Sequence, residues 1–532
     1  MRAVLMRSLA LACVVACALP ALAAGARQRG HRRPRHRPAA STKGATPKLP
    51  LGHAARWITD AGGRVLVVHG INMVYKLPPY YPSVSGFGDD DAAFLKSIGF
   101  NAVRVGVIWK AVEPQPGVYD DAYLGHIQAT VDMLARHGIV SLLDFHQDQY
   151  NERFEGEGFP DWSVQDDGLP AEPKVGFGND YLLMPALSHA FDHFWANSPG
   201  PGGVGLQDRY AAAWAHVAAR FKDDRSVLGY ELMNEPWPGT AYPSCISTNG
   251  CPGFDEQTLT PFYLRVKDAI RPVDPRTLIW YEPNVLFNNG ANTHAGPIQD
   301  PRTGFAFHDY CLPEPQTGSD EGCDPFDDMV FDDAIAHVQS TGEALMETEF
   351  GATQDVSNLT AMVQRGDRDM VPWLEWAYCG CQDPTTSGPG DKQAIVRDPA
   401  KPPTGANLVT STLHALVEPY PQLVAGTPQS WGFDSATRTF SFKYSTVRAS
   451  GRGAFRRGAI TALATPGLVY GGHYATSVNG ARIVSRRGAG LLRLAACPSV
   501  REVTVTVTPG GRNQSRCQPS RKKRRRRPHR HH

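Results

Sequence analysis

The sequence predicts a (β/α)8 barrel over residues 50–420, followed by a small antiparallel β-sandwich over residues 425–518. Three observations support this fold class. Eight short apolar runs alternate with helical patterns in the first 420 residues. Polar side chains stand where most of these runs end. After about residue 420 the helical pattern fades, and short β-rich runs replace it.

The eight expected barrel strands have helical stretches between most of them. The first, VLVVHGINMV at 65–74, is a continuous apolar run, which is typical of a strand covered on both faces. An amphipathic helix follows the second strand: Leu124, Ile127 and Val131 recur at helical spacing, and Gly138 ends the pattern. The other strands are expected at 101–109, 139–148, 227–236, 277–284, 304–311, 343–351 and 372–379.

The C-terminal region has the pattern of strands and turns. The stretches TFSFKYS, GAITALATP and VREVTVTVTP alternate apolar and polar residues, as strands with one buried face do. Such a domain binds carbohydrate or packs against the barrel, and packing is the commoner role.

Residues 1–23 resemble a secretory signal peptide. Two arginines in the first seven residues precede an apolar run at 9–24, and Ala21-Leu22-Ala23 offers a cleavage site. An alternative is a lipoprotein cleavage box at 14–17, although the residues after Cys17 remain apolar. We therefore expect a secreted protein, either free or attached to the cell surface.

The net charge of +2 conceals two basic ends around an acidic body. Residues 24–49 and 519–532 each contain eight Lys or Arg and no acid, whereas residues 50–520 carry a net charge of −16. The stretches RQRGHRRPRHR and RKKRRRRPHRHH lack apolar residues and are expected to be disordered. They either hold the protein on an anionic lipid or cell-wall surface or act as solubilising arms. Nucleic acid is not an expected partner, because no aromatic residues interleave with the charges.

Export makes the cysteines candidates for disulfides. Eight remain after residue 23, and the simplest pairing joins sequence neighbours: 245–251, 311–323 and 497–517. Cys379 and Cys381 are too close in sequence to bridge without strain. None of the spacings resembles a zinc site, so neither a metal nor another cofactor is expected.

The stretch GYELMNEPWPG (229–239) illustrates how polar groups gather at strand ends. An apolar run ends in Asn234-Glu235-Pro236, and in a barrel of this class the active site lies at the carboxyl ends of the strands. Other strand ends carry charged or aromatic residues as well. We expect these side chains to converge at one rim: Arg104, His146, Asp148, His308, Tyr310, Glu349 and Trp376.

Glu235 and Glu349 stand at the ends of the fourth and seventh strands, where they would face each other across the barrel mouth. Glycoside hydrolysis requires such a pair: a protonated carboxyl assists the leaving oxygen, and an ionised one attacks the anomeric carbon. Each charge raises the pKa of the other group, so one stays protonated until the other is consumed. A separation of about 5 Å would indicate a retaining mechanism.

These motifs resemble glycoside hydrolase family 5, a family of retaining barrels. Asn234-Glu235-Pro236 and ETEFG, which contains Glu349, are similar to its strand-four and strand-seven motifs. The resemblance implies that Glu235 is the acid/base and Glu349 the nucleophile. Supporting positions of the family match at Arg104, His146, Asn234, His308, Tyr310 and Trp376.

The resemblance also implies roles for these supporting residues. Arg104 and Tyr310 would keep Glu349 ionised and oriented, and Asn234 would bond the sugar 2-hydroxyl. The two histidines would line the same pocket, and Trp376 would offer a flat apolar face to a sugar ring.

Three longer stretches resemble the endoglycoceramidase branch, which cuts the β-linkage between a glycan and ceramide: INMVYKLPPYYP (71–82), DFHQDQYNERFEGEGFPDW (144–162) and HDYC (308–311). By this resemblance Lys76 and Asp148 contact the sugar nearest the scissile bond. Glu155 departs from the family stretch, which has a cysteine before Gly156. A ceramide leaving group also needs an apolar groove, which residues 181–187 and 284–290 would supply.

The nearest alternatives are a glucosylceramidase, a steryl-β-glucosidase and a β-glucan endoglucanase, which would use the same two glutamates. A different class is a non-catalytic glycan- or lipid-binding surface protein, but a pure binder need not keep both carboxylates. The rival carboxylates are interpreted as structural. Glu347 would point the same way as Glu349 but deeper, and Glu231, Glu282 and Glu375 would support the barrel interior or rim.

Overall fold

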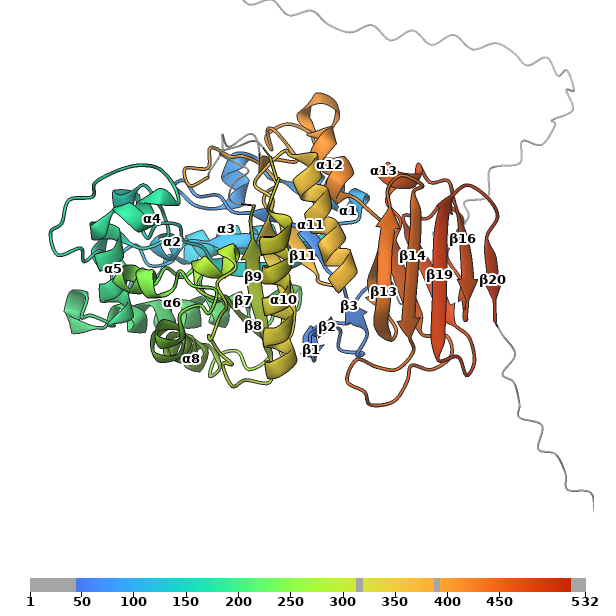
Figure 1. The fold of residues 1–532 in the computed structure, drawn as a ribbon, viewed down its shortest axis with the longest axis horizontal. Coiled ribbons are helices and arrows are strands. Elements are labelled where there is room, and N and C mark those ends of the chain that lie inside the picture. Colours follow the sequence, from blue (N-terminus) through green and yellow to red (C-terminus); the bar gives the residue numbers. More distant parts are fainter. Residues whose placement is uncertain (1–44, 312–318, 387–392, 518–532) are drawn as a thin grey trace, which may run out of the picture. The chain divides into compact units, whose positions relative to one another are not determined.

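The computed structural model describes residues 45–311, 319–386 and 393–517. Eight parallel strands close into a barrel, in which β11 pairs with β4 to complete the ring, and this confirms the predicted fold class. Figure 1 shows the barrel strands with their helices, and the antiparallel strands of the C-terminal region in orange and red. The predicted signal peptide, the tail at 519–532 and most of the basic stretch 24–49 lie outside the described residues. The barrel strands are β4 (His69–Met73), β5 (Ala102–Val107), β6 (Val140–Phe145), β7 (Val227–Glu231), β8 (Leu278–Tyr281), β9 (Thr303–Asp309), β10 (Ala344–Phe350) and β11 (Trp373–Glu375).

The first expected strand, 65–74, is two strands in different sheets. β3 (Val65–Leu66) pairs antiparallel with β12 (Tyr420–Val424), whereas β4 belongs to the barrel. The Asn101 side chain bonds the backbone at the break, donating to Val67 O over 2.9 Å and accepting from His69 N over 3.1 Å. Both pieces are buried, so the apolar run alone does not reveal the break.

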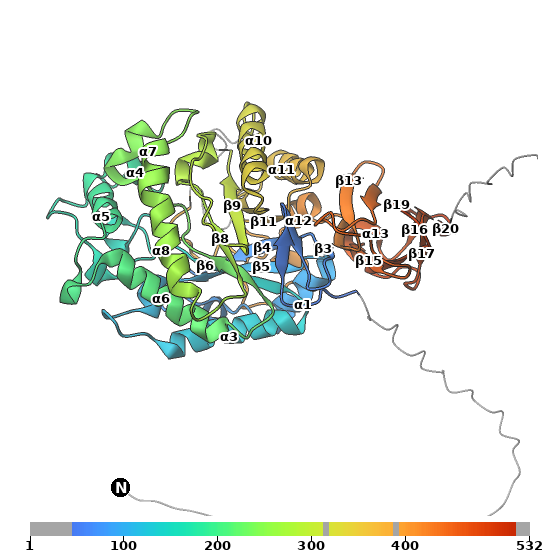
Figure 2. The same ribbon diagram turned by 90° about the horizontal axis from the view of Figure 1, so that it is seen from below.

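Helices surround the barrel (Figure 2). α3 (Asp121–Arg136) is the predicted amphipathic helix, and the Asp120 carboxylate caps it by accepting from Ala122 N and Tyr123 N. Within the described ranges, no helix combines the length and apolar character needed to cross a membrane. The other α-helices are α1 (Asp89–Ile98), α2 (Trp109–Val112), α4 (Asn179–Leu183), α5 (Pro185–Trp195), α6 (Leu206–Phe221), α7 (Pro252–Phe254), α8 (Thr260–Ile270), α10 (Asp324–Thr341), α11 (Val356–Asp369), α12 (Thr410–Leu416) and α13 (Gly467–Tyr470).

Trp280 on β8 occupies space that two neighbouring strands leave free. A Cβ atom at Gly229 on β7 or at Gly304 on β9 would lie 2.3 Å from the Trp280 ring. The indole is fully buried. Glycine on both flanking strands is therefore what allows so large a side chain at this position.

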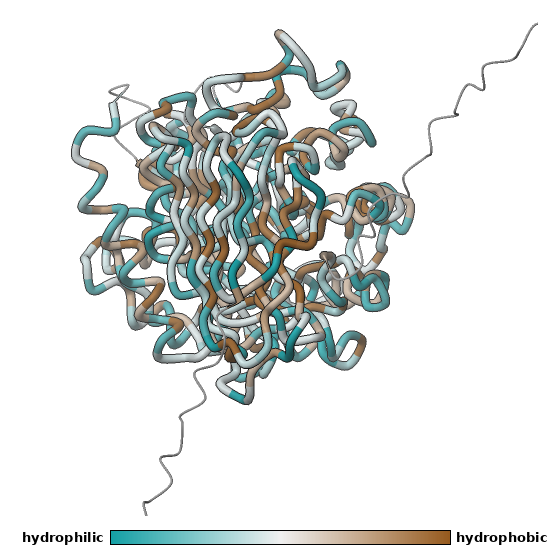
Figure 3. The backbone as a smooth tube through the Cα atoms, turned by 90° about the vertical axis from the view of Figure 1, so that its right-hand side faces the viewer, coloured by the Kyte–Doolittle hydropathy of each residue, from teal (hydrophilic) through white to brown (hydrophobic). Residues whose placement is uncertain are grey.

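Two sheets form the C-terminal domain. The first sheet has the strand order β13–β14–β19–β16–β20. The second has the order β1–β2–β3–β12–β15–β18–β17, so it includes β1–β3, which precede the barrel in the sequence. Val503, Val505 and Val507 alternate with more exposed residues along β19, and Figure 3 shows such alternation of hydropathy in the strands. The remaining strands are β1 (Gly52–Ala54), β2 (Trp57–Thr59), β13 (Thr427–Asp434), β14 (Thr439–Ser445), β15 (Ile460–Ala464), β16 (Tyr474–Asn479), β17 (Ala481–Ile483), β18 (Leu491–Ala496), β19 (Glu502–Pro509) and β20 (Gln514–Arg516).

Four disulfides occur in the described residues. The pairs 245–251, 311–323 and 497–517 are those expected from sequence adjacency. The expectation for Cys379 and Cys381 was wrong, because these two residues also pair. The chain turns through Gly380 to Cys381, whose φ is +45°, and the two Cα atoms come to 5.2 Å, which is within the ordinary range for a disulfide.

Candidate active site

The predicted site residues gather around one pocket at the carboxyl ends of the barrel strands. The pocket has a volume of about 420 Å³, and Glu235 and Glu349 both line it. The side chains are largely withdrawn from solvent, since Glu235 is 8% exposed and Glu349 4%. Other predicted residues on the pocket wall are Lys76, His146, Asp148, Tyr310 and Trp376.

Glu235 is fixed by its backbone. It follows β7 in a left-handed conformation with φ +43°, and its N–H donates to Glu282 Oε2 over 3.0 Å. The Gln147 side-chain amide donates to the carbonyl oxygens of Asn234 and Glu235 over 2.9 and 3.0 Å. The backbone turn after β7 thus places the Glu235 carboxyl at the pocket wall.

The surroundings of Glu235 favour its protonated form. Burial, followed by the negative charge of Asp148, raises the pKa of Glu235 to about 7. Its Oε1 atom accepts from the Asn288 side-chain amide over 2.7 Å and lies 2.9 Å from Nδ1 of His308. Burial lowers the pKa of His308 to about 4, so this ring is neutral at neutral pH.

Glu349 receives two hydrogen bonds on β10. Arg104 donates to its Oε1, and the Tyr310 hydroxyl donates to its Oε2 over 2.8 Å. One oxygen of Glu235, one of Glu349 and a ring nitrogen of His308 all lie within 4.8 Å of one another. This separation fits the retaining geometry, in which the two carboxyl groups are about 5 Å apart.

Arg104 is the centre of a buried charge network beneath the pocket. Its guanidinium pairs with Asp144 at 3.1 Å and with Glu282 at 3.2 Å, and it also contacts Glu231 and Glu349. Burial opposes the charge, but these carboxylates, Asp144 foremost, raise the pKa of Arg104. Glu231 and Glu282 therefore support the barrel interior, as predicted. Asn234 belongs to the same network, because its Oδ1 accepts from Arg104 over 2.9 Å.

Lys76 and Asp148 form a second charged wall. Lys76 Nζ lies 2.6 Å from Asp148 Oδ2, 3.2 Å from Asp383 Oδ1 and 2.8 Å from Thr385 Oγ1. Burial opposes ionisation of both partners, but the lysine charge holds the pKa of Asp148 well below its usual range, and Asp148 raises that of Lys76. The ammonium also lies 4.4 Å from the centre of the Trp376 ring.

His146 links this wall to the network under the pocket. Its Nδ1 lies 2.7 Å from Asp144 Oδ2, and its Nε2 lies 3.4 Å from Asp148 Oδ2. Burial works against the charged ring, but Asp144 and Asp148 raise the pKa of His146 to about 10. The ring stacks on Trp376 with 5.3 Å between centres.

Glu347 does not point the same way as Glu349, which corrects the prediction. β10 has a bulge between them: Glu347 stands opposite Phe307 of β9, whereas Glu349 stands opposite His308. Burial, followed by the negative charge of Asp309 on β9, raises the pKa of Glu347 well above the usual range. The other charges that act on it come from Arg365 on α11 and Asp327 on α10, outside the barrel. A two-residue spacing predicts a shared face only in a regular strand.

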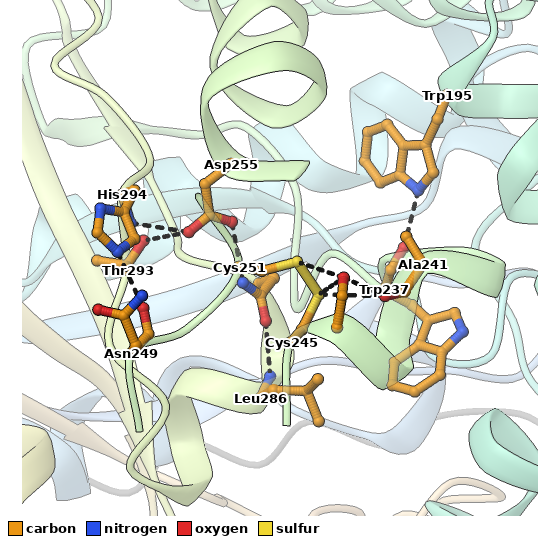
Figure 4. Close-up of a disulfide and its surroundings, with 12 residues drawn as sticks. Trp195, Trp237, Ala241, Cys245, Asn249, Cys251, Asp255, Leu286, Thr293 and His294 are labelled. Atoms are coloured by element: carbon orange, nitrogen blue, oxygen red, sulfur yellow. Dashed lines mark hydrogen bonds between the residues drawn. A yellow bond between two sulfur atoms is a disulfide. The ribbon is translucent and has the colours of Figure 1, made fainter. Parts of the chain in front are cut away.

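Both predicted apolar segments reach the pocket. Leu182 comes from the stretch 181–187, and Val285 and Leu286 come from 284–290. The Asn284 side chain accepts from Leu286 N and donates to Asp255. Asp255 also accepts from His294 N, as Figure 4 shows. The Cys245–Cys251 disulfide closes the neighbouring loop, and the Cys251 carbonyl oxygen accepts from Asp255 N over 2.9 Å.

The loop after β6 folds back tightly to complete the wall. A Cβ atom at Gly156 would lie 1.9 Å from Asp148 O, so no larger residue fits there without movement. Glu157 is buried, and burial followed by the charge of Asp148 raises its pKa well above the usual range. Glu155, where the sequence departs from the family stretch, lies away from the pocket and pairs with Lys174 at 3.4 Å.

Sequence reasoning missed several polar members of the site: Asp144, Glu157, Asn288, Asp383 and Thr385. Asp144 was detectable, since it stands two residues before His146 on the same strand and so shares its face. Asn288 lies within a stretch that was interpreted only as apolar. Asp383 and Thr385 follow β11 in a loop without a pattern.

Several buried side chains are close enough together to hold an ion. Among the residues that the structure describes, four groups of His, Asp and Glu have ligand atoms within 4.8 Å of one another. Three of them belong to the networks around Arg104, Lys76 and the two catalytic candidates, where cationic side chains already balance the carboxylates. The fourth comprises His69, Asp367 and Glu418, and burial raises the pKa of both its carboxyl groups.

A (β/α)8 barrel with a carboxyl of raised pKa and a hydrogen-bonded carboxylate at this separation defines a retaining glycosidase. The family model described as "Cellulase (glycosyl hydrolase family 5)" matches residues 70–381, and "Glycoside hydrolase family 5 C-terminal domain" matches residues 419–508. The chain belongs to glycoside hydrolase family 5.

Similar proteins cover most of the chain. It is 32% identical to Endoglycoceramidase I of Rhodococcus hoagii, with 88% of this chain and 90% of that protein covered. It is 31% identical to Endoglycoceramidase of Cyanea nozakii, with 73% and 79% covered. The solved ganglioside GM3 complex of Endo-glycoceramidase II from Rhodococcus sp. covers 86% of this chain and 99% of its own, at 27% identity and a TM-score of 0.69.

Proposed function

We propose that this enzyme hydrolyses the β-glycosidic bond between glycan and ceramide in glycosphingolipids. The observation that carries the proposal is the combination of a charged pocket with an apolar flank. Lys76 and Asp148 supply paired polar groups at one wall, while Leu182 and Leu286 supply an apolar surface at the other. The similar endoglycoceramidases named above support the same substrate class.

The first chemical step needs the protonated form of Glu235. This carboxyl donates its proton to the glycosidic oxygen while the Glu349 carboxylate attacks the anomeric carbon, so that a glycosyl–Glu349 ester forms and ceramide departs. Arg104 and Tyr310 hold the attacking carboxylate by hydrogen bonds to its two oxygens. A related solved structure is described as a lactosyl-enzyme intermediate, at 28% identity and a TM-score of 0.68.

The second step reverses the role of Glu235. Esterification of Glu349 removes a negative charge from the site, which favours ionisation of Glu235. The ionised carboxyl then takes a proton from water, and the resulting hydroxide attacks the anomeric carbon and releases the glycan from Glu349. Asn288 donates to Glu235, which supports the ionised form needed here.

The protein is proposed to act outside the cell, after removal of residues 1–23. The basic ends at 24–49 and 519–532 would hold it on an anionic surface. Export is tested by locating the protein in culture medium or on washed cells, with a variant lacking residues 1–23 as control. Retention of the full-length chain inside the cell would contradict the proposal.

Mass spectrometry of products from a glycolipid panel tests the substrate. The panel contains glucosylceramide, lactosylceramide, a ganglioside, a galactosyl series and a steryl glucoside, with Glu349→Gln as the inactive control. An intact oligosaccharide together with free ceramide is the expected result. Release only from the steryl glucoside or a single-sugar lipid, or cleavage of a soluble β-glucan alone, would replace the proposed substrate.

A further inference from the structure

The charge of the folded chain is divided sharply between two regions. Residues 50–424 contain 50 acidic residues and 23 Lys or Arg, whereas residues 425–517 contain two acidic residues and 13 Lys or Arg. Residues 425–517 therefore carry a net charge of +11, although residues 50–520 as a whole are acidic. Self-repulsion of this size disfavours the compact state, and such a surface is suited to attracting an anionic partner.

Arginines gather at one edge of this domain, where β17 and β20 lie close together. Gly480 N donates to Arg516 O over 2.8 Å, and the Arg487 guanidinium donates to Gly511 O over 3.2 Å, so the segments before β17 and after it meet the segment around β20. The Cys497–Cys517 disulfide ties the same region together. We define the arginine edge as Arg482, Arg486, Arg487, Arg512 and Arg516, all of them exposed.

The acidic residues of the domain are occupied elsewhere. Asp434 accepts from Ala436 N and Thr437 N within its own turn, and Glu502 pairs with Lys443 at 3.2 Å. These are the two acids of residues 425–517. The arginine edge thus has no acidic partner among the residues that the structure describes.

The composition of the edge indicates phosphate as the group it binds. Twelve of the 13 basic residues in 425–517 are arginine, whose planar guanidinium binds phosphate oxygens in a bidentate manner. Residues 480–490 and 510–517 contain no aromatic side chain, so the edge lacks the stacking surfaces typical of single-stranded nucleic acid sites. The acidic barrel would also repel a long nucleic acid.

We propose that the arginine edge docks the enzyme on the phosphate headgroups of an anionic lipid bilayer. The choice of a bilayer rests on the proposed function, since a glycosphingolipid substrate resides in one. Docking of this kind raises the concentration of enzyme at the surface that holds its substrate. It is distinct from the terminal stretches, because it belongs to the folded domain.

Vesicle sedimentation tests the proposal with the full-length protein. Vesicles of phosphatidylglycerol mixed with phosphatidylcholine are compared with phosphatidylcholine alone, and neither contains glycolipid. We expect binding only to the anionic vesicles, and we expect it to weaken as salt rises. Replacement of all five arginines by Gln is made in a variant that also lacks the basic ends 24–44 and 518–532. Binding should be weaker by roughly 100-fold or more than that of the variant lacking the ends alone, given the usual contribution of a basic residue near an anionic leaflet.

A matched control removes the same number of charges from the barrel. Arg136, Lys222, Arg225, Arg276 and Lys401 are exposed there, and their joint replacement by Gln should leave vesicle binding unchanged. Unchanged hydrolysis of a soluble aryl glycoside by both variants verifies that each is folded. Deletion of residues 24–44 and 518–532 in a third variant removes seven and eight Lys or Arg, and the folded domain that remains should still bind.

Three results would overturn the proposal. In the first, the edge substitutions leave binding unchanged in the variant without the two basic ends. In the second, deletion of the two basic ends alone abolishes binding. In the third, a DNA duplex competes for the protein as well as anionic vesicles do. The last result would identify a general polyanion surface instead. Because no vesicle contains glycolipid, these outcomes are independent of whether the enzyme cleaves ceramide glycosides.

Discussion

Nδ1 of His308 lies 2.9 Å from Oε1 of Glu235. The same nitrogen lies 3.5 Å from Oε2 of Glu349, so one ring faces both carboxyl groups. Burial lowers the pKa of His308 to about 4, and a neutral ring adds no positive charge between them. A charged ring would favour ionisation of both carboxyls, whereas the neutral ring is compatible with the protonated Glu235 that the first step requires.

Hydrolysis of a substrate with a poor leaving group should slow above pH 7. The acid form of Glu235 is lost as pH rises through its pKa of about 7, and above that value kcat/KM should fall about tenfold per pH unit. A pH–rate profile for an unactivated glycoside measures this limb. The control is an aryl glycoside whose leaving group needs no proton, for which the limb should be much weaker; equal limbs for both substrates would contradict the role of Glu235.

Replacing Asn288 by Ala should move the fall in kcat/KM to higher pH. The Asn288 amide donates to Glu235 over 2.7 Å, and loss of a donor to the ionised form raises the pKa of the carboxyl. Deglycosylation, which uses the ionised form, should slow by about tenfold. Asn289→Ala is the matched control, because Asn289 is its exposed neighbour on the same pocket wall; the same shift in both variants would exclude a specific effect on Glu235.

The buried His146 should stabilise the fold most strongly at acidic and neutral pH. Its pKa in the folded protein is about 10, against about 6.5 for an unperturbed histidine. The charged ring therefore makes its full contribution to the free energy of unfolding below about pH 6.5. This contribution is lost as pH rises toward 10, by up to about 1.4 kcal/mol per pH unit.

Denaturant unfolding of the wild type and His146→Gln at several pH values measures this difference. The gap between the two free energies of unfolding should narrow as pH rises from 6.5 to 10. His414→Gln, at an exposed histidine of α12, is the matched control variant. A constant gap for His146→Gln would falsify the assignment of a charged ring.

The barrel and the catalytic candidates were predictable because they depend on local patterns. Apolar runs separated by helical periodicity indicate the strands, and Glu235 stands immediately after one of them. Glu347 shows where such reasoning fails, since a bulge depends on pairing with β9 and leaves no local pattern in β10. The division of 65–74 into β3 and β4 depends in the same way on a partner, β12, more than 350 residues away.

The disulfide between Cys379 and Cys381 was missed for a related reason. Its formation requires a turn at Gly380–Cys381 with positive φ at Cys381, and sequence separation says nothing about such a turn. Asp383 and Thr385, which follow this turn, then reach Lys76. Their place in the site was set by the same local conformation.

Leu182→Ser should raise KM for a ceramide glycoside without altering hydrolysis of a soluble aryl glycoside. Leu182 lines the pocket on its apolar flank, and removal of its side chain takes away apolar contact that a lipid chain would bury. A loss of about 1.5 kcal/mol corresponds to a roughly tenfold higher KM. The control is Leu183→Ser, because Leu183 is even more exposed, at 54% against 43%, but does not line the pocket. Steady-state kinetics on both substrates distinguish the cases: an equal rise in KM for the two variants would indicate a general effect on α4, and no rise for either would remove Leu182 from the lipid-binding flank.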